Sequence, residues 1–306
     1  MPTSKNILKK TWLPSLTSLT LIGVALIWGG TFIAGKQLAA STPPLLSAFF
    51  RFLIASIVLA LCLPRRKKAQ KKTINAAQKF RIVILGLFGI FLYNVCFFYG
   101  LQYISASRAS LIVAINPAVI ALSAFLFLHE RLSVSKVAGI TACLIGAITI
   151  ILSKDPSAIV TNATTWKGDL LIVGCVISWV TYSVFSKPLI SAIGAISAVF
   201  YSLTTGTVML FLATVINGDL TIQNILNLGL LQVLCLSFLG IFGSALAYIW
   251  YYKGIEKLGA TRAGVYIALV PLFAVILGRI ILHEPITTIM MIGGFSVLAG
   301  IVLCNK

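Results

Sequence analysis

The 306-residue sequence predicts an all-α membrane protein whose ten transmembrane helices form two inverted five-helix repeats. Hydrophobic residues make up 59% of the chain and charged residues only 10%, and the mean hydropathy is +1.05. A soluble globule of this length could not cover its surface with so few polar groups. The apolar runs have about the 20 residues that a helix needs to cross a bilayer, and they lack the alternation of a membrane barrel.

Internal repetition predicts the two-unit organisation. The stretch from 100 to 150 occurs again, without a gap, from 254 to 304, and nine of the first 34 aligned residues are identical. The least common matches are Arg108/Arg262, Pro117/Pro271, His129/His283 and Glu130/Glu284. Chance would rarely align these residue types in a chain with so few ions. We therefore interpret residues 1–153 and 154–306 as two copies of one unit.

Ten apolar spans follow from the prolines, basic runs and polar segments that interrupt the hydrophobic sequence. Their approximate bounds are 16–36, 44–63, 81–101, 107–128, 134–153, 168–187, 192–216, 228–252, 262–282 and 286–304. Pro117 and Pro271 fall inside the fourth and ninth spans, where each is expected to bend the helix or only to shape it. Because each copy holds an odd number of spans, the second copy enters the membrane from the opposite face. A solute site is then expected near the midplane between the copies.

The basic residues predict the orientation. With the N-terminus in the cytoplasm, 18 of the 24 Lys and Arg residues fall on the cytoplasmic side and five on the other, while Arg51 lies inside the second span. This asymmetry follows the positive-inside rule, so both termini are expected to be cytoplasmic. Topology and the anionic inner leaflet account for the net charge of +18, and no nucleic-acid partner is expected.

Other function classes find no support in the residues. The six cysteines lack the spacing of a metal site or a disulfide framework, and we interpret them as packing residues. The sequence has no Walker A motif, and its two histidines lie at span ends, so neither an ATPase nor a membrane-embedded enzyme with a metal or cofactor is expected. Nothing in the sequence indicates an oligomeric state.

Polar and aromatic residues at helical spacing predict the walls of a cavity. In the third span they are Phe91, Asn94, Phe98 and Gln102, and in the eighth their equivalents are Ala245, Tyr248, Tyr252 and Glu256. Similar faces are Trp28, Thr31, Phe32 and Gly35 in the first span, and Trp179, Tyr182, Ser183 and Ser186 in the sixth; Asn116 and Tyr266 are further candidates. Such faces line a cavity or, alternatively, join helices by hydrogen bonds and fill the core.

Four charged residues are candidates for gating or coupling. Arg51 is the only cation well within a span, and it could extend outward to the interface, pair with a carboxylate or act on the solute. Glu130 and Glu284 end their spans and are interpreted as helix-end or gate elements. No Asp or Glu lies at the middle of a span, which weakens the case for proton antiport, and Glu256 is the nearest candidate for it.

Several motifs together resemble the EamA family of the drug/metabolite transporter superfamily. They are Trp28-Gly-Gly-Thr-Phe, Arg51-Phe-Leu-Ile-Ala, Ala106-Ser-Arg-Ala-Ser, Asn116-Pro and the span-ending Glu130, with second-copy counterparts at Trp179, Ala260-Thr-Arg-Ala, Pro271 and His283-Glu-Pro. In the second copy, Val270 stands where the first has Asn116.

The resemblance implies a ten-helix carrier in the cell inner membrane. It would export or exchange amino acids, related compounds or drugs, with the third, fourth, eighth and ninth helices around a central cavity and the first and sixth at its sides. A facilitative exchanger, an importer and a non-transporting scaffold are the alternatives. The expected partners are the lipid bilayer and a small-molecule substrate.

The topology can be tested by cysteine labelling in whole cells. Gln70→Cys should react with a membrane-impermeant maleimide only after the cells are opened, whereas Val160→Cys should react in intact cells. A background in which the six native cysteines are replaced serves as the control. The reverse labelling pattern would contradict the predicted orientation.

Overall fold

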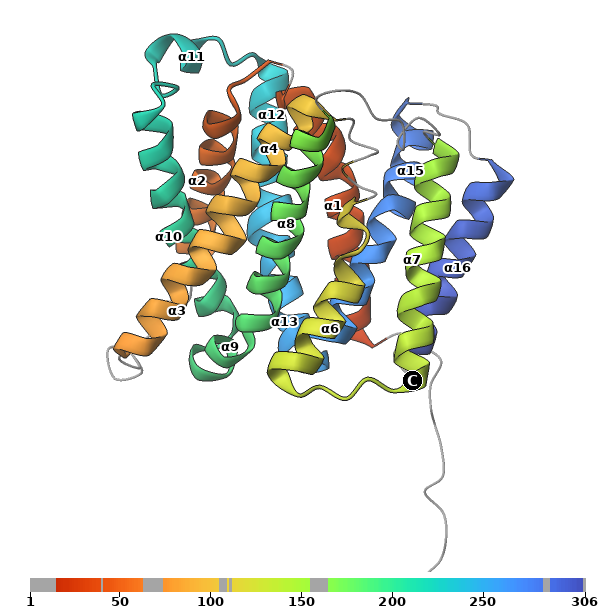
Figure 1. Ribbon diagram of the computed structural model, residues 1–306. Coiled ribbons are helices and arrows are strands. Elements are labelled where there is room, and N and C mark those ends of the chain that lie inside the picture. Colours follow the sequence, from red (N-terminus) through yellow and green to blue (C-terminus); the bar gives the residue numbers. More distant parts are fainter. Residues whose placement is uncertain are drawn as a thin grey trace, which may run out of the picture.

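The computed structural model describes residues 15–39, 41–62, 74–104, 109, 112–154, 165–282 and 287–304, and these residues form helices and short connections without a strand. The long helices run side by side as a bundle (Figure 1). Each of the ten predicted apolar spans overlaps one helix or successive helical segments among the described residues. The predicted all-helical architecture is thus confirmed in the described part of the chain.

The first half of the chain forms α1 (Leu16–Ala39), α2 (Pro44–Cys62), α3 (Ala76–Gly86), the π-helical η2 (Leu87–Leu92), α4 (Tyr93–Tyr103), α6 (Asn116–Leu128) and α7 (Val134–Lys154). Segments α3, η2 and α4 form one continuous rod. This rod begins at a capping box, in which Asn75 Oδ1 accepts from the Gln78 backbone N–H and Gln78 Oε1 accepts from the Asn75 backbone N–H.

The second half forms α8 (Thr165–Phe185), α9 (Lys187–Ile193), α10 (Ala195–Ile216), α11 (Ile222–Leu226), α12 (Leu230–Phe238), the π-helical η4 (Leu239–Leu246), α13 (Ala247–Leu258), α14 (Ala260–Val265), the 3₁₀ segment η5 (Tyr266–Leu269), α15 (Val270–Leu282) and α16 (Thr288–Cys304). The π-helical turns η2 and η4 overlap when the first copy is shifted by 154 positions, so both copies interrupt the α-helix at the same point.

Ten apolar helices or rods occur in the described residues. Six of them are long and apolar enough to cross a bilayer, and four are shorter, namely Asn116–Leu128, Val134–Ile150, Ala260–Ala274 and Thr288–Cys304.

The two repeated prolines each lie in the first turn of an α-helical segment. Pro117 lies in the first turn of α6, directly after a turn at 114–115, and Pro271 lies in the first turn of α15, directly after η5. A proline lacks the N–H that the first turn of a helix leaves unbonded, so it is tolerated at these positions. The backbone irregularity therefore precedes each proline.

Glycines bring α7 and α16 into close contact on the right of Figure 1. A Cβ at Gly139 would lie 2.6 Å from the Gly300 carbonyl oxygen, and a Cβ at Gly146 would lie 2.5 Å from that of Gly293. Gly139 contacts Gly300, and the later Gly146 contacts the earlier Gly293, so the two helices run antiparallel. Glycine is needed here because any side chain would push the backbones apart.

Positions 154 residues apart also meet across this helix pair. Ser296 Oγ donates to the Ala142 carbonyl oxygen at 3.0 Å, and Cys143 Sγ donates to that of Val297 at 3.5 Å. Equivalent residues of the two copies therefore contact each other, which is the pattern of a two-fold relation between the helices.

We expect Gly139→Leu or Gly146→Leu to destabilise the protein by about 1–3 kcal/mol or more, because the new side chain would collide with the backbone of α16. Ala138→Leu, which adds an equally large side chain at an exposed neighbouring position, is the matched control. The apparent melting temperature of the purified protein in detergent, followed by size-exclusion chromatography, measures the effect. Equal melting temperatures for both substitutions would contradict the packing argument.

Candidate functional site

A cavity lies inside the bundle, where α1, α2, α4, α6, α8, α13 and α15 meet. It contains about 710 Å³ of space not filled by atoms, including the part that is open to solvent. The lining residues are Trp28, Thr31, Phe32, Arg51, Tyr93, Phe97, Val113, Ala114, Asn116, Trp179, Tyr248, Ile267, Val270 and Pro271. They are mostly aromatic or aliphatic, with a few polar groups, which is the usual composition of a small-molecule site.

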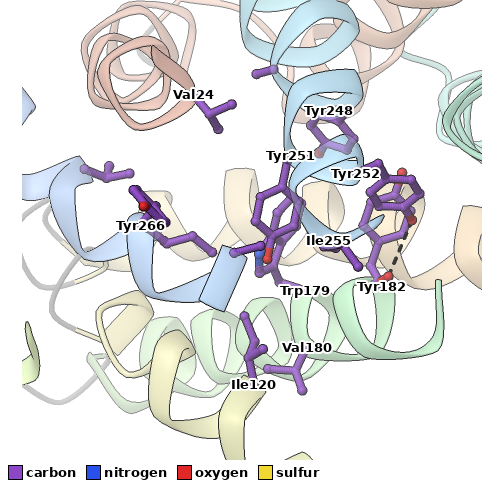
Figure 2. Close-up of a cluster of buried hydrophobic side chains, with 14 of the residues drawn as sticks. Val24, Ile120, Trp179, Val180, Tyr182, Tyr248, Tyr251, Tyr252, Ile255 and Tyr266 are labelled. Atoms are coloured by element: carbon purple, nitrogen blue, oxygen red, sulfur yellow. Dashed lines mark hydrogen bonds between the residues drawn. The ribbon is translucent and has the colours of Figure 1, made fainter. Parts of the chain in front are cut away.

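Two tryptophans, one from each half of the chain, form the centre of the cavity wall. The rings of Trp28 and Trp179 meet edge to face with centroids 5.1 Å apart. Trp28 Nε1 donates to the Gly243 carbonyl oxygen at 3.1 Å, which orients its indole. The Tyr248 ring lies 5.5 Å from that of Trp179 (Figure 2). It lies 6.2 Å from the ring of Trp28. These three predicted residues therefore line one surface together.

Three buried tyrosines, Tyr182, Tyr251 and Tyr252, lie next to Trp179 and Tyr248 (Figure 2). The Tyr251 hydroxyl donates to Ser183 Oγ at 3.1 Å, the Tyr252 hydroxyl donates to the Tyr182 carbonyl oxygen at 3.4 Å, and the Tyr182 hydroxyl shares a hydrogen bond of 3.2 Å with Ser202 Oγ. Tyr182 and Tyr252 were candidate cavity residues, but neither is among the lining residues. They fix the position of the helices that carry Trp179 and Tyr248.

Arg51 lies inside the bundle and does not extend outward to the interface. Arg51 is 6% exposed and is one of the residues that line the cavity, and its Nε donates to Ser244 Oγ at 2.8 Å. A longer contact of 3.4 Å joins Nη1 to Asn94 Oδ1, and the guanidinium carbon lies 5.0 Å from the centre of the Phe52 ring. In the described part of the chain Arg51 has no carboxylate partner.

Asn94 contributes to the cavity only through Arg51. Its side chain is fully buried, and its Nδ2 donates to the Ile90 carbonyl oxygen at 2.7 Å while Oδ1 accepts from the guanidinium. Because Asn94 is directed at α2, the lining face of α4 is one residue earlier, at Tyr93 and Phe97. Phe98 packs behind, with its ring centroid 5.6 Å from that of Phe97.

The sequence pattern predicted Asn94 and Phe98 as the lining residues of α4, and it did not predict Tyr93 and Phe97. Tyr93 and Phe97 are aromatic residues at i and i+4, their rings are stacked at 6.0 Å, and Phe32 of α1 contacts Phe97 at 5.8 Å. The π-helical turn before Tyr93 also has more residues per turn than an α-helix. Phe91 lies in this π-helical turn, so residues spaced from it by the 3.6-residue period of an α-helix do not stay on one face in α4.

Asn116 lines the cavity from the first residue of α6. Its residue is 1% exposed, and its Oδ1 has no hydrogen-bond partner in the described part of the chain. Burying an amide oxygen without a hydrogen-bond partner costs free energy, and a donor on a bound molecule would remove that cost.

Tyr266 and Glu256 are not among the residues that line the cavity. The Tyr266 hydroxyl donates to Ser18 Oγ at 2.9 Å, beside a smaller pocket between α1 and α13. Glu256 is exposed on α13. Glu284 lies outside the described residues.

Glu130 forms a polar cluster at one end of the bundle. Its Oε1 pairs with Lys187 Nζ at 2.9 Å and accepts from the Ala260 backbone N–H at 3.3 Å, while Oε2 accepts from the Thr261 hydroxyl at 2.8 Å. Burial by itself would raise the pKa of the Glu130 carboxyl, but the hydrogen bonds from Lys187 and Thr261 outweigh burial and lower the pKa below its ordinary value. The cluster joins the ends of α6, α9 and α14.

Comparisons with known proteins agree with this architecture. A solved crystal structure superimposes with a TM-score of 0.76 at 21% identity, covering 94% of this chain and 95% of that one, which shows a common fold. The uncharacterized transporter YyaM of Bacillus subtilis (strain 168) is 27% identical over 94% of this chain and 92% of its own length. An uncharacterized transporter of Archaeoglobus fulgidus is 29% identical over 90% of this chain and 93% of its own.

One relative has a named solute. A probable terminal-alkyne amino-acid exporter of Streptantibioticus cattleyicolor is 25% identical over 84% of this chain and 82% of its own length. The family model described as the EamA-like transporter family matches residues 15–152 and again residues 166–306. Because these two matches span most of the sequence, the protein belongs to the EamA-like transporter family.

Proposed function

We propose that this protein is a secondary carrier that exports small organic solutes, amino acids or compounds related to them, across the cell inner membrane by alternating access. The observation that carries the proposal is the cavity in which Trp28 and Trp179, one from each copy, meet at 5.1 Å. Membership of a transporter family supports the transport of a solute, and the probable amino-acid exporter among the relatives supports the solute class.

The inverted-repeat mechanism requires ten membrane crossings, with the repeat boundary at residues 153 and 154 and both termini in the cytoplasm. The ten apolar helices or rods support that number. The antiparallel contact of α7 with α16, in which Ser296 Oγ donates to the Ala142 carbonyl oxygen 154 residues away, supports the inversion. Rocking of one copy against the other about such a contact would expose the cavity alternately to each side.

The Glu130 cluster is well suited to a gate on the cytoplasmic side of this topology. Lys187 is 39% exposed and Glu130 15%, so water screens the pair and its net contribution is about 1 kcal/mol or less. A contact of this strength can break and reform in each transport cycle. By the repeat, Glu284 is the counterpart on the external side.

Transport itself is tested with purified protein in liposomes that are loaded with a panel of amino acids and related metabolites. We expect counterflow of at least one solute, and we expect Trp179→Ala and Tyr248→Ala to raise its apparent half-saturation concentration roughly tenfold, since each removes about 1.5 kcal/mol of aromatic contact.

Tyr201→Ala is the matched control, because Tyr201 is exposed on α10 and outside the cavity. No flux of any solute by the wild-type protein would contradict the carrier proposal. Loss of folded protein in the Trp179 and Tyr248 variants, in proportion to lost flux, would instead show that these rings only fill space.

The stabilisation from Glu130 should depend on pH. The folded protein binds a proton at this carboxyl more weakly than the unfolded chain does, because its pKa is lowered. Its contribution is therefore complete above the unfolded value of about 4.3 and is lost as the pH falls through the lower folded value. Glu130→Gln should reduce the apparent melting temperature at pH 7, and the difference from wild type should narrow below pH about 4.

Glu256→Gln provides the control for this experiment, because Glu256 is exposed on α13. A Glu130→Gln variant as stable as wild type at pH 7, or a difference that widens in acid, would contradict the assignment of the cluster.

A further inference from the structure

The charge inside the cavity is not balanced. Arg51 is the only charged residue among the described lining residues, and its hydrogen-bond partners, Ser244 and Asn94, are neutral. A guanidinium removed from water is strongly disfavoured unless an anion compensates its charge. The described part of the chain places no Asp or Glu beside it, so the compensating group has to come from elsewhere.

The guanidinium also has unused hydrogen-bond donors. Arginine has five N–H groups in a planar fork, and the two contacts to Ser244 and Asn94 use Nε–H and one Nη1–H. Both N–H groups of Nη2 and the second one of Nη1 have no partner in the described residues. This edge of the fork matches the two oxygens of a carboxylate.

The surroundings of Arg51 indicate what the rest of the ligand resembles. Tyr93, Phe97, Trp179 and Tyr248 surround the same space with ring faces and edges. The unpartnered Oδ1 of Asn116 lines it too and would accept one hydrogen bond. A single guanidinium compensates one negative charge, so a phosphate dianion would remain partly uncompensated in this cavity.

We propose that Arg51 binds the carboxylate of the transported solute, whose aromatic or branched apolar body lies against these rings. Where the solute is an amino acid, its ammonium group donates one hydrogen bond to Asn116 Oδ1. This inference rests on the proposed function, because it takes the cavity as the solute site. Ser244 and Asn94 are positioning residues that hold the guanidinium with its free edge toward the cavity. The carboxylate can belong to a zwitterionic amino acid or to a plain organic acid.

Matched pairs of acid and amide test the carboxylate directly. Binding to the purified full-length protein is measured by calorimetry for phenylalanine and phenylalaninamide, 3-phenylpropanoate and 3-phenylpropanamide, and 4-methylpentanoate and its amide. We expect at least one acid to bind roughly 10- to 100-fold more tightly than its amide, as expected for hydrogen bonds to a charged group. Phenylalanine and 3-phenylpropanoate distinguish the two sources, and tighter binding of either supports the carboxylate.

Substitution of the arginine assigns this preference to a residue. In Arg51→Gln the acid should bind no better than the amide, while affinity for the amide stays within about twofold; Arg51→Lys should retain part of the preference. Lys253→Gln, at an exposed position of α13, should behave as wild type. If Arg51→Gln does not fold, the comparison of acid and amide on the wild-type protein still decides whether the cavity selects a carboxylate.

The proposal is overturned if no acid binds, if amides bind as well as acids, or if folded Arg51→Gln keeps the full preference. Flux measurements in liposomes distinguish failure of the Arg51 proposal from failure of the proposed carrier function. Transport of an uncharged or cationic solute without any preference for acids would remove the role of Arg51 and leave the carrier intact. No flux of any solute, together with tighter binding of acids than of amides, would remove the carrier and leave the carboxylate site.

Discussion

The close antiparallel contact between α7 and α16 is the constraint on which the arrangement of the two copies depends. In a bilayer, lipid tails are as apolar as leucine, so helices associate through close packing and hydrogen bonds and gain little from the hydrophobic effect. Gly139 and Gly146 lie against the backbone of Gly300 and Gly293 and permit this packing. The same residues are repeated in the sequence, and the contact therefore relates one copy to the other.

The cavity follows from similar small-residue contacts deeper in the bundle. A Cβ at Gly89 would overlap the Tyr182 ring, and one at Gly243 would lie 2.7 Å from Thr31. Glycine at these equivalent positions of η2 and η4 lets α8 and α1 approach closely. The wall tryptophans on those helices consequently meet at the centre, and the tyrosines behind them fill the space between helices.

The two ionic features for which we propose different roles differ in their surroundings. Glu130 and Lys187 are partly exposed to water, so breaking their contact costs little and suits a gate. Arg51 is buried, so its charge is expensive to leave uncompensated and suits recognition of a ligand. The distinction rests on solvent exposure, since both sites hold a cation with hydrogen-bonding neighbours.

The sequence by itself determined the helical class, the ten apolar segments and the repetition, because hydropathy and spacing are local properties of the chain. It also predicted Trp28, Asn116, Trp179 and Tyr248, whose polar or aromatic side chains at the middle of apolar spans stand out. Only the tertiary structure decided that Tyr93 lines the cavity while Asn94 is directed at Arg51, and that Tyr182 and Tyr252 support the wall. The partner of Arg51, Ser244, is 193 residues away, and no local pattern encodes a contact that forms only when separate helices pack together.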